Sequence, residues 1–279
     1  MKNLTDRQKK RIFISIAAFL PLIVITLVMR RPFYYALIFY FLAFLVTLAL
    51  YFPNYLAVWA NLNYIRGNTE KARRLLKSAV DRNTKSPVAH LNYSILLVRD
   101  GDGANALKVL EKALALKPKL ITEKNIRLTM GSCYWVMKDI DGAIDVYEDM
   151  LKRYDYVNAH VLTSLGYMYF LRGDAEKALE TTNKALEDSP EYGAAWDNLG
   201  QIRYASGDTD EAKRAFETAV SHKADLADSN YYLGLIAEQQ NDTEKAREYF
   251  TAAHGCKLSA LNTVTRDQIE EKYAAYSTE

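Results

Sequence analysis

The sequence predicts an all-α protein: a solenoid of about six helix-turn-helix repeats with a C-terminal capping helix, preceded by a two-helix transmembrane hairpin. Six alanines recur at intervals of 34, 37, 35, 34 and 34 residues, namely Ala72, Ala106, Ala143, Ala178, Ala212 and Ala246. Self-similarity at this period is typical of stacked helical hairpins. Two long stretches without charged residues stand before the repeats, and they predict the membrane hairpin.

The N-terminal part reads as a tail and two membrane spans. Residues 1–11 hold five basic residues and one acidic residue, and we expect a basic cytoplasmic tail. Residues 12–29 and 33–52 carry no charge, and the short loop 30–32 separates them. As helices they would be about 27–30 Å long, which matches a hydrocarbon core of about 30 Å. We therefore predict two transmembrane helices, with Pro53 and the following asparagine ending the second.

Two alternatives remain for this hairpin, and its basic flanks predict an orientation. A cleaved signal peptide could explain the first stretch, although no small-residue cleavage site follows it. A shallow interfacial hairpin held by Arg30 and Arg31 is the other alternative. Basic residues before the first span and after the second outnumber the two in the loop. This bias predicts a multi-pass protein of the cell membrane, with its N-terminus and repeats in the cytoplasm.

Each repeat is predicted as helix A, a tight turn and helix B. The turns carry Gly67-Asn68, Gly101-Asp102, Lys138-Asp139, Gly173-Asp174, Gly207-Asp208 and Asn241-Asp242. Glycine and asparagine accept the left-handed conformation that ends a helix, and aspartate or asparagine caps the next one. Lys138 departs from this pattern, so we expect backbone strain there.

Small residues predict where the helices touch. Helix A carries one at matching places: Ala60, Ser94, Gly131, Gly166, Gly200 and Gly234. Helix B carries the six alanines, with larger residues between them: Leu76, Leu110, Tyr147, Phe216 and Phe250. We expect the small residues to let paired helices approach closely and the large ones to fill the space between repeats.

This pattern resembles the tetratricopeptide repeat (TPR) family over residues 54–258. The matching residues include Trp196, Leu199, Gly200, Ala212, Phe216 and Ala219, and also Leu165, Gly166, Tyr169, Ala178, Ala185 and Pro190. The third repeat departs most, with Arg127, Lys138 and Met150 at signature places. The resemblance implies a right-handed TPR α-solenoid, similar to membrane-anchored bacterial TPR proteins. Its repeats would be about 54–86, 87–123, 124–158, 159–192, 193–226 and 227–258.

A capping helix is predicted over residues 264–276. Thr265 and Gln268 have the spacing of a capping box, and Ile269, Tyr273 and Tyr276 fall on one helix face. We expect this face to cover the open end of the stack. The first helix A, residues 54–66, is apolar enough to rest in the headgroup region or to pack as an ordinary terminal helix, and both interpretations stay open.

Composition and motifs favour a binding protein over an enzyme. The two cysteines lie in separate repeats, and the four histidines are scattered without metal-ligand spacing. We find no phosphate-binding glycine loop and no nucleophile elbow. Residues 61–279 carry a net charge of −4, which gives no basic excess for nucleic acid. The sequence therefore predicts no catalytic residues, metal or cofactor.

In the TPR family the A helices line a concave groove that binds peptides or partner helices. On this face the resemblance places a predicted protein-binding set: Leu91, Ile95, Trp135, Tyr167, Phe170, Asn198, Gln201, Tyr204 and Tyr231. Several of these could instead pack against the next repeat. The chaperone-binding members clamp a C-terminal carboxylate with basic residues, and Leu91, Ile95, Leu128 and Thr129 stand at those places here, so a carboxylate clamp is not expected.

The predicted function is a membrane-anchored TPR scaffold that binds protein partners or peptide segments at the cytoplasmic side of a lipid bilayer. The alternative is an accessory subunit of a membrane transport, secretion or envelope-biogenesis complex. In that case the hairpin would make specific contacts with other membrane helices. The sequence predicts neither a particular partner nor an oligomeric state.

Overall fold

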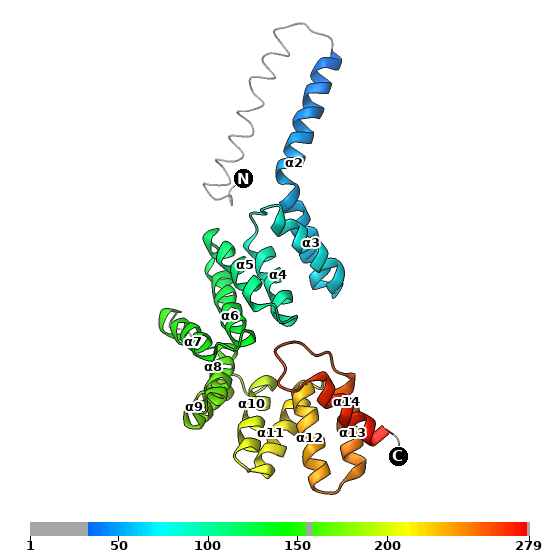
Figure 1. Cartoon of the computed structure of the whole chain (residues 1–279). Helices are drawn as coiled ribbons and strands as arrows, with labels where there is room; N and C mark the ends of the chain where they lie inside the picture. The colour runs from blue at the N-terminus through cyan, green and yellow to red at the C-terminus, as the bar shows by residue number, and fades with distance from the viewer. Residues whose placement is uncertain (1–32, 155–157, 278–279) are drawn as a thin grey trace. The chain divides into compact units, whose positions relative to one another are not determined.

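The computed structural model describes residues 33–154 and 158–277, which form thirteen helices and no strand. The predicted tail and the predicted first span, 12–29, lie outside the described residues. The helices are α2 (Phe33–Ile65), α3 (Thr69–Asp81), α4 (Pro87–Arg99), α5 (Gly103–Ala115), α6 (Leu120–Val136), α7 (Ile140–Tyr154), α8 (Ala159–Arg172), α9 (Ala175–Asp188), α10 (Gly193–Ala205), α11 (Thr209–His222), α12 (Ala227–Gln239), α13 (Thr243–Gly255) and α14 (Arg266–Ser277) (Figure 1). The chain divides into two compact units, residues 1–55 and 56–279.

Helix α2 is one continuous helix of 33 residues without a charged side chain. Its segment Leu37–Ile65 is long and apolar enough to cross a membrane, and an 18-residue window within it has a mean hydropathy of 1.9. The prediction that Pro53 ends this helix is wrong, because the helix runs through Pro53 to Ile65. Proline costs an internal hydrogen bond but fits the helical φ angle, so a long apolar helix can contain it. Its last residues therefore serve as helix A of the first repeat.

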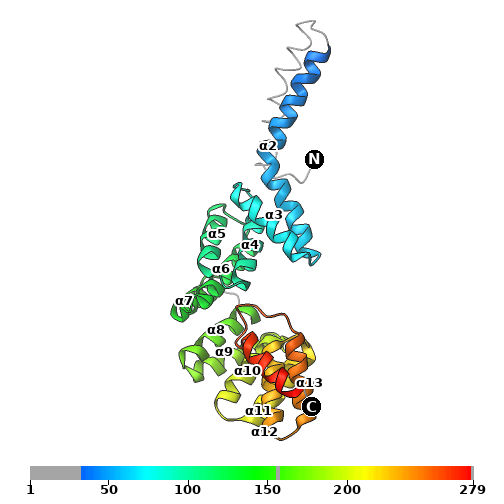
Figure 2. The same ribbon diagram turned by 45° about the vertical axis from the view of Figure 1, so that its right-hand side comes forward.

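The second unit is a stack of helix pairs (Figure 2). Five successive pairs are formed by α4 and α5, α6 and α7, α8 and α9, α10 and α11, and α12 and α13. Before them, the end of α2 shares a buried cluster with α3. The predicted turns are confirmed: Gly67, Gly101, Lys138, Gly173, Gly207 and Asn241 all have positive φ. Lys138 has a φ of 66°, which is a left-handed conformation that non-glycine residues seldom adopt, so the backbone departs there as the sequence predicted. Five of the six turn aspartates or asparagines cap the following helix, and Asn68 makes no such bond.

The small residues pack as predicted. All six repeat alanines are fully buried. The Cα of Gly200 lies so close to Phe216 that an added Cβ would be 2.5 Å from the ring, and Gly234 meets Phe250 in the same way. Phe216 and Phe250 are themselves fully buried. Each large ring of helix B thus rests on the small residue of its own helix A, which sets the close spacing of the pair.

Helix α14 is the predicted cap. The Thr265 backbone N–H donates to the Gln268 side chain at 2.8 Å, and the Gln268 N–H donates back to the Thr265 hydroxyl at 3.2 Å. Ile269 is fully buried, and the Tyr276 ring packs against Phe250 at 5.3 Å between centroids. The exposed end of the last repeat is therefore covered by a short amphipathic helix.

Candidate groove of the A helices

The predicted groove residues lie on helices α4, α6, α8, α10 and α12, which are the A helices of repeats two to six. The structure brings three of their aromatic side chains together. The rings of Trp135 and Tyr167 lie edge to face at 5.4 Å, and Tyr167 and Phe170 are 5.9 Å apart. Trp135 and Phe170 are partly exposed, whereas Tyr167 is buried. Contacts of this kind hold the three rings in place.

The other predicted residues are engaged inside the stack. The Asn198 amide donates to the Thr163 carbonyl at 2.7 Å, and the Gln201 amide donates to the Asp197 carboxylate at 2.8 Å. Leu91 is buried in the core between repeats two and three, and Tyr231 packs against Phe250. Their amide and apolar groups are therefore already used in packing.

The remaining two predicted residues lie at partly exposed places. The Tyr204 hydroxyl accepts a hydrogen bond from the Gln239 amide at 3.0 Å and its ring packs against Tyr232 at 5.1 Å. Ile95 lines a small cavity together with residues from α6 and from the C-terminal part of the chain. At Ile95 the predicted groove is therefore occupied by residues from the C-terminal part of the same chain.

Ten residues between α13 and α14, Cys256–Thr265, cross the A helices, and we call them the return segment. They contain no helix, and Figures 1 and 2 show them as a long coil between the last two helices. The Ala260 N–H donates to the Arg99 carbonyl at the end of α4, at 2.9 Å. Residues far from the end of the chain in sequence, on α4 and α6, therefore contact this segment.

Asp228 of α12 is the polar anchor of the return segment. Its carboxylate accepts four hydrogen bonds, from the Asn262 amide (2.8 Å), the Thr263 N–H (2.9 Å), the Thr263 hydroxyl (2.9 Å) and the Val264 N–H (2.8 Å). A carboxylate oxygen accepts hydrogen bonds from donors of both kinds. Two of the four come from the backbone, so Asp228 holds the main chain of the return segment as well as its side chains.

Leu261 is the apolar anchor. It packs against the buried cluster that contains Leu91, Val98 and Cys133. Together with Ser259 it lines the cavity of about 240 Å³ that Ile95, Leu128 and Thr129 share. A side chain of the return segment thus covers the predicted groove residues of α4.

A second carboxylate lies close to Asp228, the polar anchor. Asp197 of α10 accepts hydrogen bonds from the Ser229 hydroxyl and from the Gln201 amide. Burial, and then the nearby charge of Asp228, raise the pKa of Asp197 to about 7. Burial also raises the pKa of Tyr167, which a side-chain hydrogen bond with Thr263 opposes. The floor of the groove is therefore acidic and holds neutral hydrogen-bond donors.

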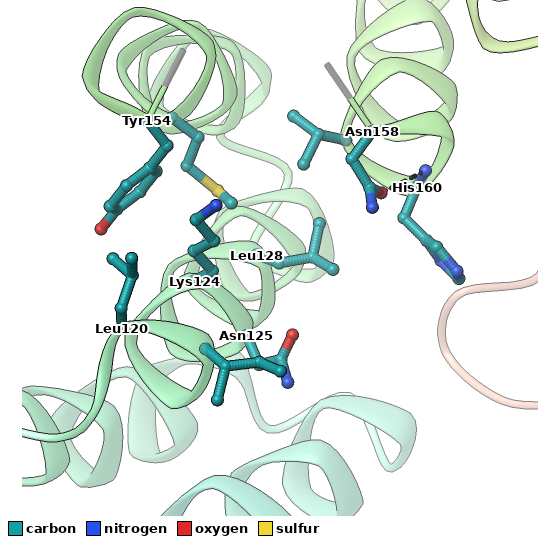
Figure 3. Close-up of a pocket in the computed structure, with 10 residues that line it drawn as sticks. Leu120, Lys124, Asn125, Leu128, Tyr154, Asn158 and His160 are labelled. Atoms are coloured by element: carbon teal, nitrogen blue, oxygen red, sulfur yellow. Dashed lines mark hydrogen bonds between the residues drawn. The ribbon is translucent and has the colours of Figure 1, made fainter. Parts of the chain in front are cut away.

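An open apolar cavity of about 540 Å³ adjoins the groove. It is lined by the start of α6, the end of α7 and the start of α8, and Figure 3 shows Leu120 and Lys124 on one side with Asn158 and His160 on the other. Leu128 lines both this cavity and the smaller one that Ser259 and Leu261 of the return segment line. The two spaces are therefore neighbours along α6. Among the described residues, no three His, Cys, Asp or Glu side chains are grouped so that they could hold a metal ion.

Sequence reasoning missed Asp228 as the residue that holds positions 262–264, and it missed the return segment altogether. A signal was available for Asp228, because an acidic residue stands on the groove face where a carboxylate clamp would need a basic one. Nothing in the local pattern of residues 256–265 indicates which distant helix they contact. That contact is tertiary, and periodicity describes only neighbouring repeats.

Comparisons with known proteins agree on the repeat type. The sequence model of the family described as tetratricopeptide repeat matches residues 59–121, 128–193 and 198–257. The BBSome complex member BBS4 of Bos taurus is 29% identical over 140 residues, which are 49% of this chain and 25% of that protein. The match thus spans only a quarter of that relative's length.

Solved structures share the fold at low sequence identity. The structure of the APC/C hetero-tetramer Cut9-Hcn1 matches with a TM-score of 0.63 and 14% identity, over 81% of this chain and 43% of that chain. The structure of PilW, a type IV pilus biogenesis factor, matches with a TM-score of 0.56 and 17% identity, over 71% of this chain and 90% of that chain. At these identities the likeness concerns the arrangement of helices.

Proposed function

Because the chain belongs to the tetratricopeptide repeat family, we propose that it is a membrane-anchored scaffold that binds protein partners through the groove of its A helices. One observation carries this proposal: the groove already holds a stretch of polypeptide through backbone hydrogen bonds and a partly buried leucine. Such a surface suits a partner's peptide segment. The exposed aromatic edge made by Trp135 and Phe170 adds contact area with few rotors to freeze.

Helix α2 supports the membrane part of the proposal. Within the segment Leu37–Ile65, the 18-residue window that is apolar enough to span a membrane has no buried residue, whereas Leu56, Ala57 and Ala60 are buried in the first repeat. Exposing this apolar surface to water is unfavourable, whereas the hydrocarbon of a lipid bilayer would cover it. The proposal also includes the first predicted span, residues 12–29, and it places the N-terminus and the repeats in the cytoplasm. A reporter enzyme that is active only outside the cytoplasm, fused after Glu279, is expected to stay silent.

A complex subunit is the second candidate, and the unpartnered surface of α2 favours it. Large side chains such as Phe41, Phe44 and Leu50 are exposed by 60%, 60% and 72%. They could pack against helices of another membrane protein as well as against lipid. Replacing residues 12–52 by an unrelated two-span hairpin separates the candidates, because a scaffold keeps its activity and a subunit loses it.

Crosslinking and pull-down from membranes test the groove. We expect the double variant Trp135→Ala/Tyr167→Ala to lose partners that the wild type retains. Tyr249→Ala on α13 is the matched control, because it removes a partly buried aromatic ring that lies outside the predicted groove set. Both variants must keep the helical circular dichroism of the wild type. An unchanged set of partners in the folded double variant would refute the groove as the binding surface.

A further inference from the structure

The return segment contacts the groove as a bound peptide would. Its residues 259–262 form a turn in which the Asn262 N–H donates to the Ser259 carbonyl, and its backbone N–H groups at positions 260, 263 and 264 all donate to other parts of the stack. A connection between two adjacent helices needs only a few residues. This one uses ten residues and reaches α4, four repeats away from its own. The segment is therefore longer than a connection between α13 and α14 requires, and it follows the A helices as a bound peptide would.

The contacts define what this place accepts. Leu261 enters the apolar socket next to Ile95 and Leu128, and the next three residues meet Asp228. Two of the carboxylate's donors are backbone N–H groups, which any residue except proline supplies. The other two are a side-chain amide and a hydroxyl. A carboxylate on the ligand would face Asp228 and Asp197, and like charges there are unfavourable.

The return segment can leave without undocking α14. The Arg266 guanidinium donates to the His254 and Cys256 carbonyls, at 3.1 Å in each case. These bonds tie the start of α14 to the end of α13, which are the two ends of the segment. The capping helix is held separately by Ile269 and by Lys272, whose ammonium bonds to Glu238 at 2.6 Å. The segment is thus a loop closed at its base, with its middle resting in the groove.

We propose that residues 259–264 are a resident ligand of the groove. The partner segment that the groove binds is then an uncharged peptide with an aliphatic residue followed by small polar residues such as asparagine, serine or threonine. This inference rests on the proposed function and names the ligand class of the same groove. A tethered ligand has an effective concentration of about millimolar, so it lowers the apparent affinity of any weaker competitor. A partner must therefore match these contacts or add others in the neighbouring cavity beside Leu128.

A labelled synthetic peptide with the sequence of residues 257–265, KLSALNTVT, tests the proposal on the full-length protein in detergent micelles. Fluorescence anisotropy gives its affinity for the wild type and for Leu261→Asp, which removes the tethered copy's apolar anchor. We expect Leu261→Asp to bind the peptide at least tenfold more tightly than the wild type. Leu171→Asp, at an exposed leucine of α8, is the control and is expected to match the wild type. Adding Asp228→Ala to Leu261→Asp is expected to abolish binding, and so is aspartate in place of the peptide's central leucine.

Several results would overturn the proposal. One is a folded Leu261→Asp variant that binds the peptide no better than wild type; another is equal binding of both peptides. A change from dimer to monomer in Leu261→Asp would assign the site to exchange of segments between copies. Hydrogen exchange on the wild type decides the matter if Leu261→Asp does not fold. Saturating unlabelled peptide is expected to speed exchange in residues 259–264, and no change there contradicts the proposal.

The outcomes separate this inference from the proposed function. If the peptide displaces the return segment but partners stay crosslinked to Trp135→Ala/Tyr167→Ala, the groove has a resident ligand and the proposed partner surface is wrong. If partners are lost from the double variant and the peptide never competes, the groove binds partners and the resident-ligand inference is wrong.

Discussion

The buried carboxylate pair under the return segment predicts an unusual dependence of stability on pH. Asp197 is buried next to Asp228, and its pKa in the folded protein is raised to about 7. An unfolded aspartate ionises near pH 4. Between these values the folded state binds more protons than the unfolded state, so the free energy of unfolding falls as pH rises. The stabilisation is fully present below about pH 4, is lost through about pH 7, and changes no further above that.

The size of the effect follows from the same shift. One group that is protonated only in the folded state gives a slope of at most about 1.4 kcal/mol per pH unit. For a domain of about 150–250 residues this corresponds to roughly 3–6 °C in Tm per pH unit. No basic side chain is among the groups that set the pKa of Asp197, and its hydrogen bonds come from Ser229 and Gln201.

Thermal unfolding of Asp197→Asn between pH 4.5 and 8 measures this contribution, because asparagine cannot titrate. The difference in Tm between the wild type and the variant is expected to shrink, or to reverse in favour of asparagine, as pH rises. Burial lowers the pKa of His90, which gives a slope of opposite sign, but His90 is the same in both proteins and cancels in the difference. Asp225→Asn, at an exposed carboxylate before α12, is the control. Parallel curves for wild type and Asp197→Asn would refute the reasoning.

Two further predictions concern the repeats. In Gly200→Leu the added Cβ would lie 2.5 Å from the Phe216 ring, and this overpacking is expected to lower the free energy of unfolding by about 1–3 kcal/mol in thermal or denaturant unfolding. Gly255→Ala is the control, because no atom lies within 4 Å of its added Cβ, and it is expected to be neutral or slightly stabilising. Asp174→Ala removes a capping bond to the Lys177 N–H and is expected to cost about 1 kcal/mol, whereas Asn68→Ala, which loses no such bond, is expected to cost clearly less; equal losses would contradict the capping argument.

Much of the repeat architecture could be predicted because its determinants are local. Every turn needs a residue that tolerates positive φ and a cap for the next helix, and both are visible as dipeptides in the sequence. The alternation of small and large residues is also local, since Gly200 and Phe216 belong to one repeat. Even the departure at Lys138 could be predicted, because the other five turns show what that position must do.

The site was harder to predict for a physical reason. Asn198 and Gln201 have suitable chemistry for a peptide backbone, yet their amides donate to Thr163 and Asp197 within the stack. A sequence shows that a polar residue lies on a groove face, but it does not show whether a neighbouring repeat uses its hydrogen bonds first. The aromatic set fared better, because Trp135 and Tyr167 are large enough to meet across adjacent repeats. Contact does not by itself show that they bind a ligand, which remains a prediction.

The end of helix α2 was predicted wrongly for a related reason. Proline was read as a stop after an apolar run, but a helix without charged residues gains little by ending in an apolar environment, where free backbone groups are costly. Helix α2 therefore continues through Pro53 and supplies Leu56, Ala57 and Ala60 to the core of the first repeat. One continuous helix thus carries both the apolar segment and the first element of the solenoid.

The return segment connects the capping of the stack with its binding surface. A terminal repeat needs a cover for its apolar face, and α14 supplies it through Ile269 and Tyr276. A short connection to that helix would have sufficed, since Arg266 already joins the ends of the segment. The extra residues bring Leu261 to α4 and the next three residues to Asp228, so they bury groups that would otherwise leave an apolar socket and a carboxylate exposed to solvent or a partner. If the segment leaves the groove as we propose, these contacts are lost while Ile269 and Lys272 still hold α14, so the end of the stack need not unfold.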